Sequence, residues 1–209
     1  TLNRSESVLR LLDCLSQQSV LPDEVLIIEQ GGQNVWDHQS KLNFHFPIRI
    51  VYEDIKSLTY ARDKGVCLSS GEIIFFFDDD IILPLSYIKI AIDFLNSNPN
   101  AQGIGGRYVD QNYAGPSTLS NVVSRLMRIR GHGKGNKILP SGWGDFVRGD
   151  DIYNVTNADW LFGCNMVVRR YVFNDIRFET NMRAWSFLED LFFGAQLTKT
   201  FGSCLWIHP

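Results

Sequence analysis

Apolar positions along the first part of the chain change their period, and each change predicts a new element. Apolar residues recur at helical spacing after Ser5, whose side chain can cap such a helix. A continuous apolar run at 24–28 follows, as expected for a parallel strand covered on both faces. The turn Gln30-Gly31-Gly32 ends that run. The pattern therefore opens with a helix and a buried strand.

Strand and helix patterns then alternate along the chain. A strand candidate at 48–52 precedes a helix that Ser57 caps and that runs to Ser70. The most strand-like stretch is 72–77, and Pro84 opens the next helix in its first turn, where proline is best tolerated. Three alternations with short connections predict an α/β fold with a doubly wound, mostly parallel sheet flanked by helices.

The second half of the chain is less regular. Residues 131–150 carry six glycines among scattered polar residues, which predicts a mobile loop over the functional site. Order resumes at 160–170, followed by a helix at 188–199 and a strand at 203–207. We expect one domain over residues 1–209, cut at both ends, since a helix opens the chain without the strand that should precede it.

Composition narrows the class of protein. With 44% apolar and 21% charged residues, the chain has the balance of a soluble globular protein. Its net charge of −3 and pI near 5.8 provide no basic surface for nucleic acid. Nucleic acid is therefore excluded as a partner, and a phosphate-bearing ligand has to be held locally.

Cysteines and hydropathy indicate the compartment. The four cysteines are far apart, form no Cys-x-x-Cys pair and have apolar neighbours, so we interpret them as reduced core residues. No apolar run approaches the roughly 20 residues that cross a bilayer, and no signal peptide opens the chain. We expect a cytoplasmic protein, with peripheral association at the inner face of a membrane left open to segments outside this chain.

The triplet Asp78-Asp79-Asp80 at the end of the third strand is the first chemical signal. Adjacent carboxylates repel one another unless water or a cation offsets their charge. On an extended backbone Asp78 and Asp80 point to one side, so they could share Mg²⁺ or Mn²⁺, which prefer oxygen ligands. The alternative is an acidic, solvated turn.

The order of several short motifs carries a resemblance over essentially the whole chain. It resembles bacterial-type family-2 glycosyltransferases, which have the GT-A fold. The motifs are Thr1-Leu2-Asn3-Arg4, Val25 to Glu29, Ala61-Arg62-Asp63-Lys64-Gly65, Phe75 to Asp80, Gly163-Cys164-Asn165 and Glu189-Asp190. The resemblance implies a nucleotide-sugar-binding half at 1–110 and an acceptor-binding half at 111–209.

In the donor half, the resemblance implies contacts to a nucleotide-diphosphate sugar and to one metal ion. Asp80 is the implied ligand of Mg²⁺ or Mn²⁺, and the ion would neutralise charge on the leaving diphosphate. Glu29 stands where the family commonly has an Asp-rich strand end, and Asp63 replaces the usual Asn of its helix motif. The implied nucleotide-sugar contacts are Thr1, Arg4, Glu29, Arg62, Asp78 and Asp79.

In the acceptor half, the resemblance implies that Asp190 is the general base and that Glu189 positions the acceptor or the helix. The alternative for this pair is a favourable interaction with the helix dipole. Gly163 and Asn165 match a loop beside the acceptor, and His208 matches a late histidine that binds the metal. Tryptophans can also offer a flat apolar face to a sugar; the candidates are Trp160, Trp185 and Trp143.

These expectations combine into one predicted reaction. An inverting glycosyltransferase would move a sugar from a nucleotide-diphosphate sugar to an acceptor hydroxyl on a glycan or a lipid-linked molecule. One alternative is a nucleotidyltransferase, which also uses strand-end carboxylates and a metal but attacks phosphorus and gives Glu189-Asp190 no role. Another is a non-catalytic domain that binds nucleotide-sugars or glycans.

Overall fold

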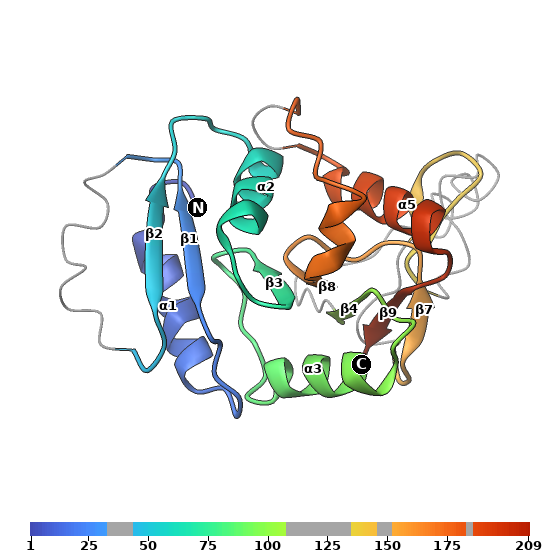
Figure 1. Ribbon diagram of the computed structural model, residues 1–209, viewed down its shortest axis with the longest axis horizontal. Helices are drawn as coiled ribbons and strands as arrows, with labels where there is room; N and C mark the ends of the chain where they lie inside the picture. Colours follow the sequence, from blue (N-terminus) through green and yellow to red (C-terminus); the bar gives the residue numbers. More distant parts are fainter. Residues whose placement is uncertain (33–43, 108–134, 146–151, 183–185) are drawn as a thin grey trace, which may run out of the picture.

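The computed structural model describes residues 1–32, 44–107, 135–145, 152–182 and 186–209 (Figure 1). The first helix and the first two strands lie on the left of the view, and the last helix and the last strand lie on the right. The helices are α1 (Ser5–Ser16), α2 (Leu58–Leu68), α3 (Tyr87–Ser97), α5 (Glu189–Phe201) and the 3₁₀ helix η4 (Arg170–Asn174). The strands are β1 (Val25–Glu29), β2 (Ile48–Tyr52), β3 (Ile73–Phe77), β4 (Gly103–Gly106), β5 (Lys137–Ile138), β6 (Gly144–Asp145), β7 (Thr156–Ala158), β8 (Asn165–Arg169) and β9 (Leu205–His208).

The first helix forms because its apolar residues fall on one face. Val8, Leu11, Leu12 and Leu15 are buried and share a hydrophobic cluster with Ile27 of β1. The predicted cap is wrong, because Ser5 is already the first helical residue and the N-cap position falls on Arg4, without a side-chain hydrogen bond. α1 therefore depends on its apolar face rather than on a cap.

The start of α2 confirms the predicted Ser57 cap. Its side chain accepts a hydrogen bond from Tyr60 N at 3.3 Å, as an N-cap residue does. The same hydroxyl donates to the Met182 carbonyl oxygen at 2.6 Å. This serine thus fixes the beginning of α2 and ties it to the C-terminal half.

The sheet is mixed, which corrects the expectation of a mostly parallel one. β1 and β2 pair in parallel, and a five-stranded sheet has the order β3-β8-β4-β9-β7. Within that sheet β4 and β9 are parallel, whereas the other three pairs are antiparallel. The antiparallel pairs come from β7 and β8 in the irregular second half, where apolar periodicity indicates strands but not their direction.

The beginning of α3 also differs from the prediction. The helix starts at Tyr87, not in the turn of Pro84, and its N-cap is Ser86. Tyr87 N donates to the Pro84 carbonyl oxygen at 3.0 Å, so the proline belongs to a turn that leads into the helix. Proline does precede the helix, but by three residues.

Part of the glycine-rich segment is an ordered hairpin rather than the predicted mobile loop. β5 and β6 pair antiparallel, with Lys137 opposite Asp145. The tip closes through hydrogen bonds from Leu139 N to Trp143 O and from Gly142 N to Leu139 O, both 2.8 Å long. Gly142 has φ +79°, a left-handed conformation that glycine adopts without strain. Residues 131–134 and 146–150 lie outside the described residues.

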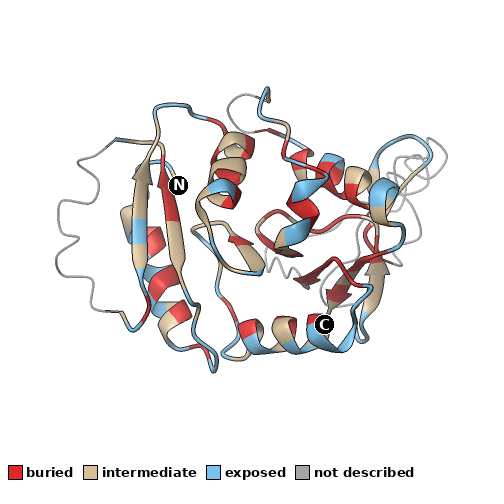
Figure 2. Ribbon diagram, in the orientation of Figure 1, coloured by how far each residue is buried: buried red, intermediate tan, exposed pale blue. Residues whose placement is uncertain are grey.

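A hydrophobic cluster joins the five-stranded sheet to α5. Figure 2 shows buried residues along both the sheet and this helix. Within the cluster Phe193 of α5 stacks on Phe173 of η4 and on Phe178. Phe76 of β3 meets the same two rings edge to face. All four cysteines are free thiols, but Cys67 is exposed, so the expectation of four core cysteines is wrong there. None of the helices in the described part of the chain is long and apolar enough to cross a membrane.

Candidate functional site

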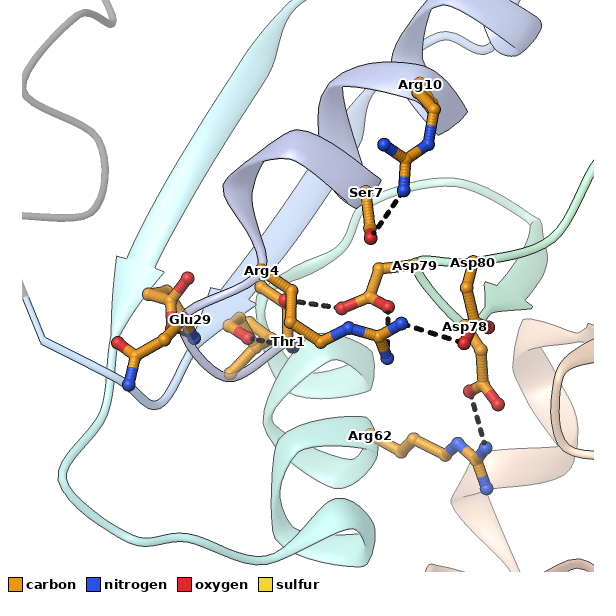
Figure 3. Close-up of polar contacts among 11 residues, drawn as sticks. Thr1, Arg4, Ser7, Arg10, Glu29, Arg62, Asp78, Asp79 and Asp80 are labelled. Carbon is orange, nitrogen blue, oxygen red and sulfur yellow. Dashed lines mark hydrogen bonds and ion pairs between the residues drawn. The ribbon is translucent and has the colours of Figure 1, made fainter.

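The aspartate triplet lies where β3 ends (Figure 3). Asp78 N still donates to the Cys164 carbonyl oxygen at 3.2 Å, whereas the chain turns at Asp79 and Asp80. The turn breaks the side-chain alternation of a strand. The extended backbone assumed for the triplet thus ends at Asp78, and a divalent ion shared by Asp78 and Asp80 stays a prediction. In this conformation Asp79 and Asp80 share a cation of the chain itself.

That shared cation is the guanidinium of Arg4. Its Nη1 lies 2.8 Å from Asp79 Oδ1, and its Nη2 lies 2.9 Å from Asp80 Oδ2. Thr1 Oγ1 donates to Asp79 Oδ2 at 2.5 Å, so Asp79 is held from both sides. The side chain of Asp79 is 10% exposed, whereas Asp80 is 54% exposed. Asp80 is the carboxylate of this pair that a ligand can reach.

Glu29 supports the loop at the end of β1. The residue is fully buried, and its Oε1 accepts hydrogen bonds from Asn3 N at 3.1 Å and Gly31 N at 2.7 Å. Thr1 lies beside the same strand, because Gln30 N donates to the Thr1 carbonyl oxygen at 3.0 Å. Glu29 thus shapes the loop after β1, and its contact with a nucleotide stays a prediction.

Arg62 joins the two carboxylate groups that the sequence analysis treated separately. Its Nη2 lies 3.5 Å from Asp78 Oδ1, and its Nη1 forms an ion pair with Glu189 Oε1. Arg62 and Glu189 are 8% and 6% exposed, so this pair is shielded from solvent. Burial raises the pKa of the Glu189 carboxyl, and the charge of Arg62 opposes that shift. Burial likewise raises the pKa of Asp78, again opposed by Arg62.

The Glu189-Asp190 pair begins α5 after a residue in a left-handed conformation. Leu188, the N-cap, has φ 65° and ψ 20°. Asp190 Oδ1 accepts from Leu191 N at 2.8 Å, and its Oδ2 accepts from Gly163 N at 3.1 Å. The helix-terminus role considered for Asp190 is thus present, and one carboxylate also connects α5 to the loop before β8.

The Gly163 loop lies beside the Glu-Asp pair, and its predicted contact with the acceptor stays a prediction. A Cβ at Gly163 would lie 2.5 Å from Arg62 Nη2 and 2.8 Å from Glu189 Oε1, so a side chain has no room. Asn165 is 8% exposed, and its Nδ2 donates to the Gly106 carbonyl oxygen at 3.2 Å. The amide of Asn165 therefore links β8 to β4 in this conformation.

The tryptophans predicted to face a sugar behave differently from one another. Trp160 is 6% exposed and its indole nitrogen donates to the Asp145 carbonyl oxygen at 3.2 Å, so it is a core residue here. Trp185 lies outside the described residues. Trp143 is 43% exposed and contacts Phe187, which is 70% exposed. Sequence reasoning missed Phe187, although an aromatic residue two positions before the Glu-Asp pair was a usable signal.

His208 lies on β9 and is aligned with Gly106 of β4, so two strands separate it from β3. Its Nδ1 is 3.0 Å from the Pro209 carbonyl oxygen. Within the described residues, no three His, Cys, Asp or Glu side chains are grouped as metal ligands. Asp80 and His208 therefore stay predicted ligands.

The site thus contains two groups of acidic residues, one from each half of the chain, joined by a buried arginine. One group, at the end of β3, is held by Arg4 and Thr1, while the other begins α5. This arrangement can hold a phosphate-bearing ligand near its cations and can accept a proton at a carboxylate. It suits a group-transfer enzyme of the α/β class.

Comparison with known proteins identifies the family. The pattern of glycosyl transferase family 2 matches residues 1–177, and the chain belongs to that family. This is the family that the resemblance implied, and it gives no support to the nucleotidyltransferase alternative. The glucosyl-dolichyl phosphate glucuronosyltransferase of Haloferax volcanii is 23% identical over 111 residues, which cover 52% of this chain and 36% of that relative.

Solved structures confirm the fold class. A structure of S. aureus TarS with UDP-GlcNAc aligns with a TM-score of 0.64 and 14% sequence identity. The alignment covers 100% of this chain and 54% of the TarS chain. The mannosyltransferase PcManGT of Pyrobaculum calidifontis, solved with GDP-Man and Mn²⁺, covers 100% of this chain and 54% of its own, with a TM-score of 0.63 and 14% identity. The GT-A fold is thereby confirmed, and the chain spans about half the length of these neighbours.

Proposed function

We propose that this chain transfers a sugar from a nucleotide-diphosphate sugar to an acceptor hydroxyl, with inversion at the anomeric carbon. The observation that carries the proposal is the position of Arg62 between Asp78 and Glu189. Through Arg62, the carboxylates of the donor half lie next to those of the acceptor half. A direct transfer needs this proximity, because donor and acceptor have to react in one pocket.

On the donor side, Arg4 and Asp80 are the groups we assign to the diphosphate end of the donor. Both are about half exposed, at 49% and 54%, so they can rearrange around a ligand. Carboxylate oxygens such as those of Asp80 are the ligands that Mg²⁺ and Mn²⁺ prefer, so the residues present fit a divalent ion. When bound, such an ion would stabilise charge on the diphosphate. We keep Asp80 as its principal ligand and His208 as a second candidate.

On the acceptor side, we assign the general base to Asp190. Its carboxylate would take the proton of the acceptor hydroxyl while that oxygen attacks the anomeric carbon from the face opposite the diphosphate. The new glycosidic bond forms as the bond to the diphosphate oxygen breaks, so the configuration inverts. Glu189 is buried against Arg62, and we therefore assign it a positioning role for α5 rather than proton transfer.

The test measures donor binding and turnover separately. Calorimetry with UDP-, GDP- and dTDP-sugars, with and without Mn²⁺, should identify one donor that binds more tightly with the ion. Asp80→Ala should abolish that binding. Asp190→Asn should bind the donor like the wild type but release nucleoside diphosphate about 10²- to 10⁴-fold more slowly, the usual effect of losing a general base.

Asp93→Asn is the matched control, because Asp93 is a surface carboxylate of α3 paired with Lys89 and lies outside the site. It should keep both binding and turnover. An Asp190→Asn variant that turns over at the wild-type rate would contradict the assignment of the base. A wild-type protein that binds a donor but never consumes it would favour the non-catalytic domain.

A further inference from the structure

Two exposed aromatic side chains lie in contact beside the start of α5. The ring centroids of Trp143 and Phe187 are 6.3 Å apart, with planes inclined at 53°. The residues are 43% and 70% exposed. Scattered exposed apolar residues are common, but two large rings in mutual contact form a continuous apolar surface. We call this pair the aromatic platform.

The Trp143 side of the platform is fixed to α5. Trp143 stands at the tip of the β5–β6 hairpin, which Lys137 anchors through a 3.0 Å ion pair with Asp159. The next residue, Gly144, approaches α5 so closely that an added Cβ would lie 2.9 Å from Leu191 Cδ1. Leu191 directly follows Asp190, so the hairpin holds Trp143 at the first turn of the helix that carries the proposed base.

The Phe187 side is fixed by the chain turn before α5. Leu188 adopts a left-handed conformation, φ 65°, which is uncommon for a residue with a branched side chain. This turn leaves Phe187 exposed while Ser186 and Glu189, on either side of it, are buried. A large apolar ring that stays mostly exposed at such a constrained position favours a role in binding.

Two polar atoms in the residues that flank Phe187 along the chain indicate what kind of ligand would cover the platform. Ser186 Oγ and Glu189 Oε2 are buried and have no hydrogen-bond partner among the described residues. Unpaired buried polar atoms cost stability until a ligand or water satisfies them. A ligand for this segment therefore needs a flat apolar face and hydroxyl groups at its edge. A sugar ring has both, whereas an acyl or prenyl chain has only the apolar surface.

We propose that Trp143 and Phe187 bind a sugar ring of the acceptor by stacking, so that the acceptor is a glycan recognised through its sugar. This inference rests on the proposed function, since it uses the base assigned to Asp190 to define the acceptor side. The pyranose would lie with its C–H face on the platform and its hydroxyl edge toward Ser186 and Glu189.

The test measures glycan binding directly and without donor. Saturation-transfer NMR with cellotriose, chitotriose, maltotriose and mannotriose should detect binding of at least one trisaccharide to the wild type through its ring C–H protons. Trp143→Ala and Phe187→Ala should each weaken that binding at least about 10-fold, equivalent to about 1.4 kcal/mol. Phe187→Leu, which keeps an apolar side chain but loses the flat ring, should weaken it as well.

Tyr171→Ala is the matched control, because Tyr171 is 47% exposed but lies in η4, past the other end of β8. It should bind the glycan like the wild type, and circular dichroism should show all variants folded. The inference is overturned if no trisaccharide binds the wild type, if decyl phosphate binds in its place, or if both alanine variants bind unchanged. Because no donor is present, these outcomes are independent of the turnover that tests the proposed function.

Discussion

At the scale of single residues, Gly163 is a closely surrounded glycine of the site. Its backbone N–H donates to Asp190, while the space in front of its Cα is filled by Arg62 and Glu189. Glycine is needed here for lack of room. The residue therefore controls the buried ion pair and the proposed base together.

Gly163→Ala should damage catalysis more than folding. The added methyl group would displace Arg62 or Glu189, and overpacking of this kind costs about 1–3 kcal/mol. We expect turnover to fall roughly 10²-fold, because displacing the first turn of α5 misplaces the base. Steady-state kinetics and urea unfolding would measure the two effects.

The control for this substitution is Gly65→Ala in α2, where an added Cβ would meet nothing within 4 Å. Alanine should stabilise that helix by about 0.5–1 kcal/mol and leave turnover unchanged. Equal losses of turnover in both glycine variants would contradict the steric role of Gly163.

At the scale of elements, two helices with a serine at the N-cap depend on it differently. Ser57 at the start of α2 makes a side-chain cap and also donates to Met182, whereas Ser86 at the start of α3 makes no side-chain cap. The amino acid is the same, but its bonding is not. α3 instead depends on buried apolar residues such as Leu95.

Ser57→Ala should therefore lower the free energy of unfolding by about 1–2 kcal/mol, the usual cost of losing a helix cap. Ser86→Ala should change it by less than about 0.5 kcal/mol. Urea denaturation followed by far-ultraviolet circular dichroism would measure both values. If Ser86→Ala were as unstable as Ser57→Ala, the loss would come from having serine at the N-cap and not from the hydrogen bonds that its side chain makes.

At the scale of the whole molecule, a phenylalanine cluster holds α5 against the sheet. Phe193 of α5 is 1% exposed and stacks on two other rings. Its ring centroid lies 4.4 Å from that of Phe178 and 5.6 Å from that of Phe173. Phe76 of β3 contacts Phe178 at 5.3 Å. The strand that ends in the aspartate triplet and the helix that begins with the Glu-Asp pair thus share one core.

Phe193→Ala should destabilise the protein by about 3–5 kcal/mol, because it leaves a cavity at the centre of this cluster. Phe192, the preceding residue, is 43% exposed, and Phe192→Ala should cost less than about 1 kcal/mol. Thermal and chemical unfolding would compare the two. Similar losses for both variants would mean that α5 packs on a different face.

Much of this protein follows from its sequence alone. Apolar periodicity predicted the ends of β1, β2 and β3 to within about a residue and the end of α2 to within two residues. Each of these segments buries apolar residues and has a clear cap or turn. The order of its short motifs gave the family, which the match over residues 1–177 confirms. These features are local, so they can be recognised along the chain.

Only the tertiary structure decided the directions of β7 and β8, the burial of Trp160 and the pairing of Arg62 with Glu189. Sequence reasoning assigned Arg62 to the nucleotide and missed Phe187 entirely. Each of these features depends on which distant segments meet, and apolar spacing contains no information on that. The sequence thus determined most of the elements and the family, whereas long-range packing determined how Arg62 brings the acidic groups together and how the β5–β6 hairpin packs on α5.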